Sequence, residues 1–237
     1  MKLLSRMTRF LRPSRNLWPV QDRTFLADRF LRGNGLEIGA LHNPLPVPAG
    51  VLVRYIDRMP VSELRQHYPE LAALPLIPLD IIDDGETLKT IPDHSQDFII
   101  ANHFLEHCED PIGAFKNFYR VVKSGGILYL AIPEKSQTFD CERPVTGMDH
   151  LWEDHTQGTD HSRLGHYREW AQLVDHRTDD AEDHAQRLMQ KKYSIHFHVW
   201  DQPAWQNFLA EMQSTAHFKL EWMCQHGIEL ISILRKK

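Results

Sequence analysis

The sequence G-L-E-I-G-A-L-H-N-P, residues 35–44, places one acid, Glu37, inside a short apolar run that ends at Gly39. A short apolar run bounded by glycine is typical of a buried strand. Glycine at its end lets the chain turn without a Cβ clash and lets a ligand approach the backbone closely. Because ligands of doubly wound α/β folds bind beyond the carboxyl ends of the strands, we expect Glu37, Gly39 and Ala40 to lie at a small-molecule site.

Three later segments carry the same kind of signal, a strand next to a polar or glycine-containing turn. They are V-L-V-R-Y-I-D (51–57), Q-D-F-I-I-A-N-H-F-L-E-H (96–107) and V-V-K-S-G-G-I-L-Y-L-A-I-P (121–133). With the first stretch they resemble the class I S-adenosylmethionine-dependent methyltransferases. The likeness is closest to small bacterial proteins with a type 11-like methyltransferase domain, which have E-I-G, Y-x-D-R, L-E-H and G-G-x-L-x-L-x-x-P motifs. It covers roughly residues 33–133.

This resemblance implies an α/β fold with a doubly wound, Rossmann-like and mostly parallel seven-stranded sheet. The last strand would be antiparallel, and a polar helical insertion would lie between strands five and six. It also implies S-adenosylmethionine as the cofactor and methyl transfer (EC 2.1.1.-) as the reaction. The chain departs from the family pattern acid-x-Gly-x-Gly-x-Gly, because Leu41 and Asn43 stand where the later glycines would be.

The connection between the first two strands is unusually short. Only residues 40–50 separate them, and this segment contains Pro44, Pro46 and Pro48. A normal βαβ crossover needs about a dozen residues or more. The usual helix is therefore predicted to be very short or replaced by an extended proline-rich loop.

Asp57 ends the second predicted strand, about 20 residues after the first glycine turn, where an acid accepts hydrogen bonds from both ribose hydroxyls of a nucleoside. We assign Asp57 and the adjacent Arg58 to the cofactor site. The alternative is an ordinary acid at a strand end that caps the helix predicted for residues 62–71.

Residues 74–80 are predicted to form the third strand. By resemblance, an acid and its neighbour after this strand contact the adenine. We assign Asp80 and Ile81 to that role, with Asp83 and Asp84 as competing candidates.

Residues 97–101 are predicted to form the fourth strand, and the H-x-L-E-H segment after it resembles the family segment that lines the methionine side of the cofactor. We assign Asn102 and His103 to cofactor binding, and His103 and His107 as candidate catalytic residues. The alternative for both histidines is capping and packing of the next helix. A DNA amino-methyltransferase would resemble N/D-P-P-Y/F here, so A-N-H-F argues against nucleobase amines as the acceptor.

The second half of the chain predicts a sheet interrupted by a long polar segment. An amphipathic helix over 110–123 is expected to end at the glycine pair 125–126, before a strand over 127–132. A closing hairpin is expected from 218–224 and 228–234. We therefore divide the chain into a basic N-terminal helical segment (1–32) and a methyltransferase-like domain (33–237), in which 134–212 is an insertion that covers the substrate.

Histidines are frequent in the predicted insertion. His150 and Asp154 would share one face of a helix, and His196 and His198 one face of an extended segment. None of the strong metal signatures such as H-E-x-x-H is present, so we assign no metal, although a bound divalent ion is one interpretation. The others are an acceptor pocket, with His150 as a catalytic base, and a polar lid with satisfied histidines.

Composition limits the function and the setting of the protein. The net charge of -5 argues against a nucleic-acid partner. Three cysteines with no C-x-x-C pair fit a reducing compartment, so we expect a cytoplasmic location. Residues 1–15 are basic and carry apolar residues at helical spacing, which indicates either contact with a membrane surface or a protein partner, or packing on the chain's own domain.

The favoured hypothesis is a methyltransferase that acts on a small-molecule or glycan acceptor, at oxygen or nitrogen. The alternative is a non-catalytic partner protein of the same fold that binds the cofactor or an assembly without turnover. An NAD-dependent oxidoreductase is disfavoured, because no glycine fingerprint is present to hold a pyrophosphate.

Overall fold

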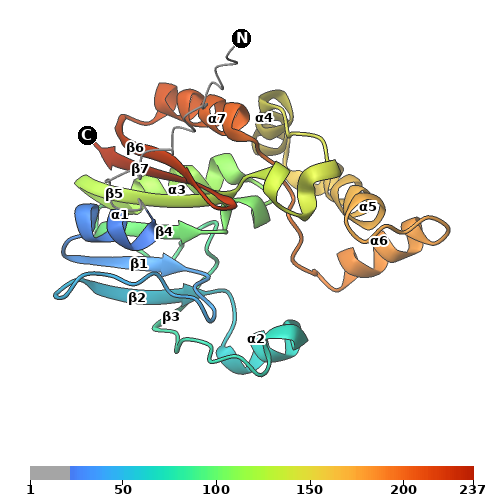
Figure 1. Cartoon of the computed structure of the whole chain (residues 1–237), viewed down its shortest axis with the longest axis horizontal. Helices are drawn as coiled ribbons and strands as arrows, with labels where there is room; N and C mark the ends of the chain where they lie inside the picture. Colours follow the sequence, from blue (N-terminus) through green and yellow to red (C-terminus); the bar gives the residue numbers. More distant parts are fainter. Residues whose placement is uncertain (1–21) are drawn as a thin grey trace, which may run out of the picture.

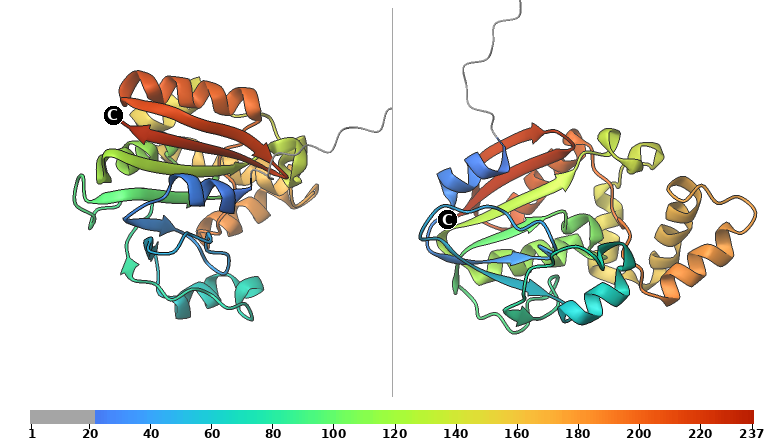
Figure 2. Two further views of the ribbon diagram at one scale, coloured as in Figure 1. Left: turned by 60° about the vertical axis from the view of Figure 1, so that its left-hand side comes forward. Right: turned by 60° about the horizontal axis from the view of Figure 1, so that its bottom comes forward.

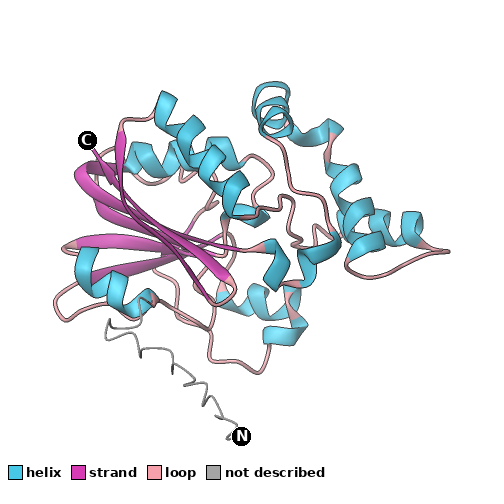
Figure 3. Cartoon of the chain, turned by 45° about the horizontal axis from the view of Figure 1, so that its top comes forward, coloured by secondary structure: helices cyan, strands magenta, loops and turns pink. Residues whose placement is uncertain are grey.

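The computed structural model describes residues 22–237, which form one twisted sheet with helices on both faces (Figures 1 and 3). The predicted helix over residues 1–15 lies outside this range. The strands are β1 (Asn34–Ile38), β2 (Leu52–Asp57), β3 (Ile81–Ile82), β4 (Gln96–Asn102), β5 (Val122–Pro133), β6 (Phe218–His226) and β7 (Glu229–Lys236). Their order in the sheet is β3-β2-β1-β4-β5-β7-β6, and β7 runs antiparallel to both of its neighbours. The predicted Rossmann-like sheet with an antiparallel last strand is therefore confirmed.

Seven α-helices lie among the described residues. They are α1 (Arg23–Phe30), α2 (Val61–His67), α3 (Pro111–Val121), α4 (Met148–Gln157), α5 (Arg163–Leu173), α6 (Ala181–Gln190) and α7 (Gln202–Thr215). Side-chain caps fix several of their starts: Asp22 accepts from the Phe25 amide, Asp110 from Gly113, and Asp201 from Ala204. No helix within residues 22–237 is long and apolar enough to cross a membrane.

Helices α3 and α7 cover one face of the sheet and build the larger core. Phe115 and Phe118 of α3 and Trp205 and Phe208 of α7 are fully buried against strand residues of that face such as Ile99. Alternate residues along the same strands point to the other face, as the period of two in a strand requires.

The second face is covered more thinly. Leu26 and Leu31, from α1 and its end, pack there with Leu45 of the proline-rich loop against Phe98 and Ile100 of β4. Residues 40–50 contain no helix, so the prediction of an extended loop in place of the first crossover helix is confirmed. This loop does the covering that a crossover helix normally does.

Two predicted element boundaries are wrong. The third strand was expected over residues 74–80, but β3 consists of Ile81–Ile82 alone. Pro75 and Pro78 lack the N–H groups that a ladder needs, so residues 74–79 form no strand. Pairing with β2 begins where the Asp80 amide donates to the Tyr55 carbonyl at 2.9 Å. The glycine pair 125–126 does not end α3; that helix ends at Val121, and both glycines lie within β5, where Gly125 has a φ of 79°.

Helices α4, α5 and α6 stand beside the carboxyl ends of the strands rather than over a face of the sheet (Figure 2). α5 and α6 share a small core of their own with the extended segment 195–197, built around Tyr167, Trp170 and Phe197. The chain then returns through α7, which packs on the sheet.

Candidate functional site

A cavity of about 470 Å³ opens at the carboxyl ends of the central strands. It lies where β1 stands between β2 and β4, which is the point at which the strand order reverses in a doubly wound sheet. The residues that line it follow different strands: Gly39 after β1, Asp57 at the end of β2, Gly85 after β3, and His103 after β4. The sheet therefore gathers them from across the sequence.

The backbone on two sides of this cavity has glycine-type geometry. Gly39 has a φ of 65°, and its amide donates to the Ile56 carbonyl at 3.0 Å. A Cβ atom on Gly85 would lie 2.5 Å from the Phe104 ring and 2.6 Å from Ile38. Leu41 stands where the family pattern has glycine, yet it keeps a φ of 50°. The loop therefore retains the left-handed turn although the glycine is lost.

Asp57 and Arg58 both line the cavity. Asp57 Oδ1 accepts from the Arg58 amide at 2.7 Å, and burial raises the pKa of the Asp57 carboxyl. The Arg58 guanidinium donates to the Tyr68 hydroxyl at 2.9 Å, which ties the end of β2 to the end of α2. Both residues therefore line the cavity at the end of β2, and the ribose role of Asp57 stays a prediction.

Glu37 and Ala40 are buried near the cavity but are not among the residues that line it. The Glu37 carboxylate accepts from the Leu45 amide at 2.9 and 3.1 Å, so it fastens the proline-rich loop to β1. Burial raises the pKa of Glu37 to about 7. Its contact in the structure is with the loop that replaces the crossover helix.

Three further residues predicted to contact the cofactor lie off the cavity wall: Asp80, Ile81 and Asn102. Asp80 precedes β3 and accepts from the Tyr55 amide at 2.8 Å, and Ile81 begins that strand. Asn102 ends β4, and its buried side-chain atoms have no hydrogen-bond partner among the described residues. Of the acids named as competitors, Asp84 lines the cavity.

His103 is held in a network of carboxylates at the cavity wall. Its Nδ1 lies 3.3 Å from Glu106, its Nε2 donates to Glu229 at 2.8 Å, and its φ is 49°. Although burial acts in the opposite direction, hydrogen bonds and charges from these two carboxylates raise the pKa of His103 to about 9. The ring is therefore a cation at neutral pH.

His107 lines the same cavity as a neutral imidazole. Burial and the neighbouring His196 lower its pKa to about 4. Its Nδ1 donates to the Ile195 carbonyl at 2.8 Å, so Nε2 carries the lone pair. A neutral imidazole of this kind can accept a proton.

Several residues that line the cavity were not predicted from the sequence. Glu86 follows Gly85, and burial raises its pKa to about 7 even though it accepts from the Glu109 and Asp110 amides. Tyr193 and Ser194 reach the cavity from the predicted insertion. The D-D-G-E run at 83–86 was the available signal for Glu86, because a glycine between acids after a strand is a place where a ligand can approach.

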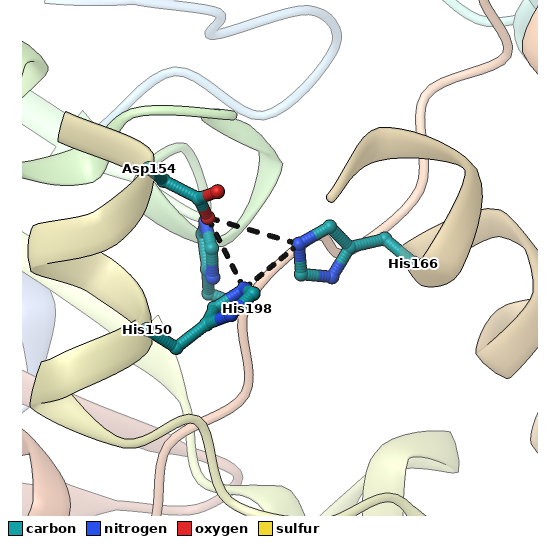
Figure 4. Close-up of side chains that lie close together, drawn as sticks. All are labelled: His150, Asp154, His166 and His198. Carbon is teal, nitrogen blue, oxygen red and sulfur yellow. Dashed lines mark hydrogen bonds and ion pairs between the residues drawn. The ribbon is translucent and has the colours of Figure 1, made fainter. Parts of the chain in front are cut away.

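His150 lies away from this cavity, in a second cleft of about 770 Å³ between α4 and α5. It forms a cluster with Asp154, His166 and His198 (Figure 4). The predicted pairing of His150 and Asp154 on one helix face is confirmed, with His150 Nε2 3.1 Å from Asp154 Oδ2. A smaller group of Glu106, His107 and His196 lies beside the first cavity.

Comparison with known proteins agrees with this architecture. Residues 53–130 match the family described as a methyltransferase domain, a segment that includes Asp57, Asp84, His103 and His107 but not the proline-rich loop. No protein of curated function matches the sequence.

Solved structures share the fold at low sequence identity. A Thermotoga maritima protein described as a possible histamine N-methyltransferase is 14% identical with a TM-score of 0.48, over 91% of this chain and 90% of that one. A Rhodobacter sphaeroides protein described as a candidate zinc-dependent alcohol dehydrogenase is 14% identical with a TM-score of 0.50, over 90% and 88%. The CurJ carbon methyltransferase is 15% identical with a TM-score of 0.45, and this chain, matched over 86% of its length, spans 49% of it.

Proposed function

We propose that this protein, a class I S-adenosylmethionine-dependent methyltransferase, transfers the methyl group of its cofactor to an oxygen or nitrogen atom of a small-molecule or sugar-like acceptor. The observation that carries the proposal is the cavity of about 470 Å³ at the carboxyl ends of β1, β2 and β4. Its volume is in the range of about 300–1,000 Å³ that small-molecule sites occupy. Asp57, Gly39 and Gly85 meet there.

The residues present fit the cofactor. Asp57 would accept hydrogen bonds from the ribose hydroxyls, and Asp84 would lie toward the base. Gly39 and Gly85 leave room for the ligand, because a Cβ on Gly85 would meet the cavity wall. When bound, the cofactor supplies a methyl group already activated on a sulfonium, so the protein mainly aligns the acceptor and excludes water.

Among the three histidines predicted to be catalytic, we propose His107 as the residue that accepts the proton of a hydroxyl acceptor. It is neutral at physiological pH and lines the cavity, whereas His103 is a cation tied to two carboxylates. His150 lines the separate cleft. Once an acceptor is found, His107→Gln should lower kcat by about 10²–10⁴-fold for an oxygen acceptor, with cofactor affinity unchanged.

We further propose that residues 134–212 cover the acceptor, because Tyr193 and Ser194 of this segment complete the cavity wall. Three cysteines in 237 residues, with no C-x-x-C pair, support a reducing compartment such as the cytoplasm.

Calorimetric titration of the purified chain with S-adenosylmethionine and S-adenosylhomocysteine, with NAD as a control ligand, tests the proposal. We expect binding of both methyl cofactors and not of NAD. Asp57→Ala should weaken it by about 100-fold or more, because hydrogen bonds to a charged group are worth about 1.5–3 kcal/mol each.

Asp80→Asn is the matched control. It changes a nearby acid that lies off the cavity wall and keeps an oxygen for the Tyr55 amide. The affinity of Asp80→Asn for S-adenosylmethionine and S-adenosylhomocysteine should equal that of the wild type. An Asp57→Ala variant that binds normally would refute the ribose assignment, and a chain that binds neither methyl cofactor would favour the non-catalytic partner protein.

A further inference from the structure

The cleft between α4 and α5 contains four side chains whose donor atoms converge. His150, Asp154, His166 and His198 each offer one nitrogen or oxygen, and these atoms all lie within 4.8 Å of one another. His150 Nε2 is 3.1 Å from His166 Nε2 and 3.1 Å from Asp154 Oδ2, while His166 Nε2 is 3.8 Å from the same oxygen (Figure 4). A tetrahedral ion with bonds of about 2.0–2.1 Å has ligand atoms about 3.3 Å apart. The two distances of 3.1 Å are close to that spacing, and the distance of 3.8 Å is longer.

Two atoms of the cluster are buried without a hydrogen-bond partner among the described residues. They are Asp154 Oδ2 and His198 Nδ1, and both side chains are fully buried. A buried polar atom that is left unpaired destabilises the folded state. Two imidazole nitrogens that face each other can share only one proton between them, so hydrogen bonding within the cluster cannot satisfy all four groups.

The groups behind these side chains hold them in place. Asp154 Oδ1 accepts from the Ser162 hydroxyl at 2.5 Å, which leaves Oδ2 directed at the histidines. His198 Nε2 donates to the Glu109 carbonyl at 3.1 Å and lies 3.9 Å from Asp154 Oδ2, so the unpartnered Nδ1 is the nitrogen left to bind an ion. Metal-binding histidines commonly donate their other ring N–H to a carbonyl in this way, and binding carboxylates are commonly hydrogen-bonded in turn.

From this geometry we propose that His150, Asp154, His166 and His198 bind one divalent transition-metal ion of the zinc class. Three imidazoles and one carboxylate, with no thiolate, suit Zn²⁺ and chemically similar ions rather than Mg²⁺ or Ca²⁺, which prefer oxygen ligands. The cleft gives the ion access, because the His150 side chain is 36% exposed.

Four protein ligands fill a tetrahedral ion, so its role is structural. The ligands come from α4, from α5 and from the irregular segment 193–200, which contains His198. That segment also carries Tyr193 and Ser194, which line the first cavity. The ion would therefore fasten together three parts of the chain that lie outside the sheet.

The test uses the full chain, purified without a polyhistidine tag. Metal content is first measured by mass spectrometry, and the chelated protein is then titrated with Co²⁺ and followed by its visible absorption. We expect one ion per chain, absorption of tetrahedral intensity, and displacement of Co²⁺ by Zn²⁺. At a hundredfold excess of Zn²⁺ over Kd, Tm should rise by about 5–10 °C.

His166→Ala and Asp154→Asn should each weaken Co²⁺ binding by at least about 100-fold. The matched control is His184→Gln on α6, a histidine paired with Asp175 and outside the cluster, which should bind like the wild type. Circular dichroism and S-adenosylhomocysteine affinity of each variant show that it is folded, so that loss of metal is separable from loss of the cofactor site.

Two results would overturn the proposal. One is a wild-type chain that binds no ion in stoichiometric amount, or cluster variants that bind as tightly as the wild type. The other is binding that survives His166→Ala but is lost in His196→Gln, which would place the ion at the group of Glu106, His107 and His196 instead.

Discussion

The cofactor cavity and the histidine cluster bring distant residues together by different physical means. The cavity residues follow buried parallel strands, whose pairing is fixed by ladders such as Glu37 opposite Tyr55 and Ile100. The cluster residues stand on two helices and one extended segment beside the sheet. α5 and the extended segment share a smaller core with α6, whereas Leu151 of α4 packs in the larger core. Backbone register therefore sets the first site, whereas side-chain contacts set the second. We therefore expect ligand binding at the cavity to be most sensitive to substitutions that crowd the backbone. Binding at the cluster should be most sensitive to the loss of single side chains.

Among substitutions that compare the two regions, the largest effect on stability is expected from adding one methyl group at the cavity. Gly85→Ala places a Cβ 2.5 Å from the Phe104 ring and 2.6 Å from Ile38, in a packed wall. Overpacking of this kind costs about 1–3 kcal/mol, and we expect about tenfold weaker S-adenosylhomocysteine binding as the wall shifts. Urea unfolding and calorimetry measure the two quantities.

The same substitution in the second region should act in the opposite direction. Gly165 lies in α5 with nothing within 4 Å of an added Cβ. Gly165→Ala should stabilise the chain by up to about 1 kcal/mol through helix propensity and leave cofactor binding unchanged. Equal effects at the two glycines would contradict the distinction drawn between the regions.

The next effect concerns pH, through Glu37. Its folded-state pKa of about 7 lies above the ordinary value of 4.5, so the native state binds more protons than the unfolded state between these pH values. The free energy of unfolding therefore falls as pH rises from about 4.5 to 7. Glu37→Gln removes this loss and keeps an acceptor for Leu45, so at pH 8.5 the variant should be more stable than the wild type by about 3 kcal/mol.

The advantage of Glu37→Gln should disappear at pH 4.5, where the wild-type carboxyl is protonated in the native state. Glu86→Gln is the matched comparison in the cavity, because the pKa of Glu86 is also raised to about 7. Glu86→Gln should also reduce the fall in the free energy of unfolding between pH 4.5 and 7, and it should alter cofactor binding as well. A Glu37→Gln variant that loses equal stability at both pH values would show that the native carboxyl is charged throughout.

His103 gives a smaller pH effect of the same sign in a higher pH range, because its folded-state pKa is also raised. Its folded-state pKa of about 9 exceeds the ordinary 6.5, so its ion pairs stabilise fully below pH 6.5 and are lost as pH rises through 9. His103→Asn, which tolerates the positive φ, should cost about 1–2 kcal/mol at pH 6 after allowing for a ring that is 30% exposed, and almost nothing at pH 10.

His176→Asn is the control for His103→Asn. This exposed residue near the end of α5 has a φ of 50°, so the substitution meets the same backbone conformation without the buried carboxylates. Its cost should be within about 0.5 kcal/mol at both pH values. A His103→Asn cost that does not change with pH would contradict the cationic state of His103.

The sheet was predicted well from the sequence, because each of its longer strands can be recognised from its own run of apolar residues. β1, β2 and β4 were found within one or two residues. β3 was missed because it has only two residues, and the proline-interrupted apolar run before it bonds to the β2 backbone only at Asp80. Residues of the cavity wall were predicted where they directly end a strand, as Asp57 does. They were not predicted where a distant segment contributes them, as for Tyr193.

The histidine cluster could be predicted only in part. The spacing of four between His150 and Asp154 placed them on one helix face, and α4 confirms it. The position of His166 depends on the turn between α4 and α5, where Gly158 has a φ of 87°, and no residue spacing encodes that. A cluster joined across such a turn has no linear signature like H-E-x-x-H.

The smallest effect is expected at Leu41, where the chain departs from the family glycine pattern. A leucine at φ 50° carries a strain of about 1–2 kcal/mol, which Leu41→Gly would relieve, while glycine adds about 0.5–1 kcal/mol of backbone entropy cost and removes a side chain from the cavity wall. Because these terms oppose each other, stability should change by less than about 1 kcal/mol. Because the turn is already in the glycine conformation, S-adenosylhomocysteine affinity should stay within about twofold, as it should for Lys192→Gly at φ 49° beyond α6. An affinity gain of tenfold in Leu41→Gly alone would mean that the leucine obstructs the cofactor, and that the altered loop, rather than the strand ends, limits binding.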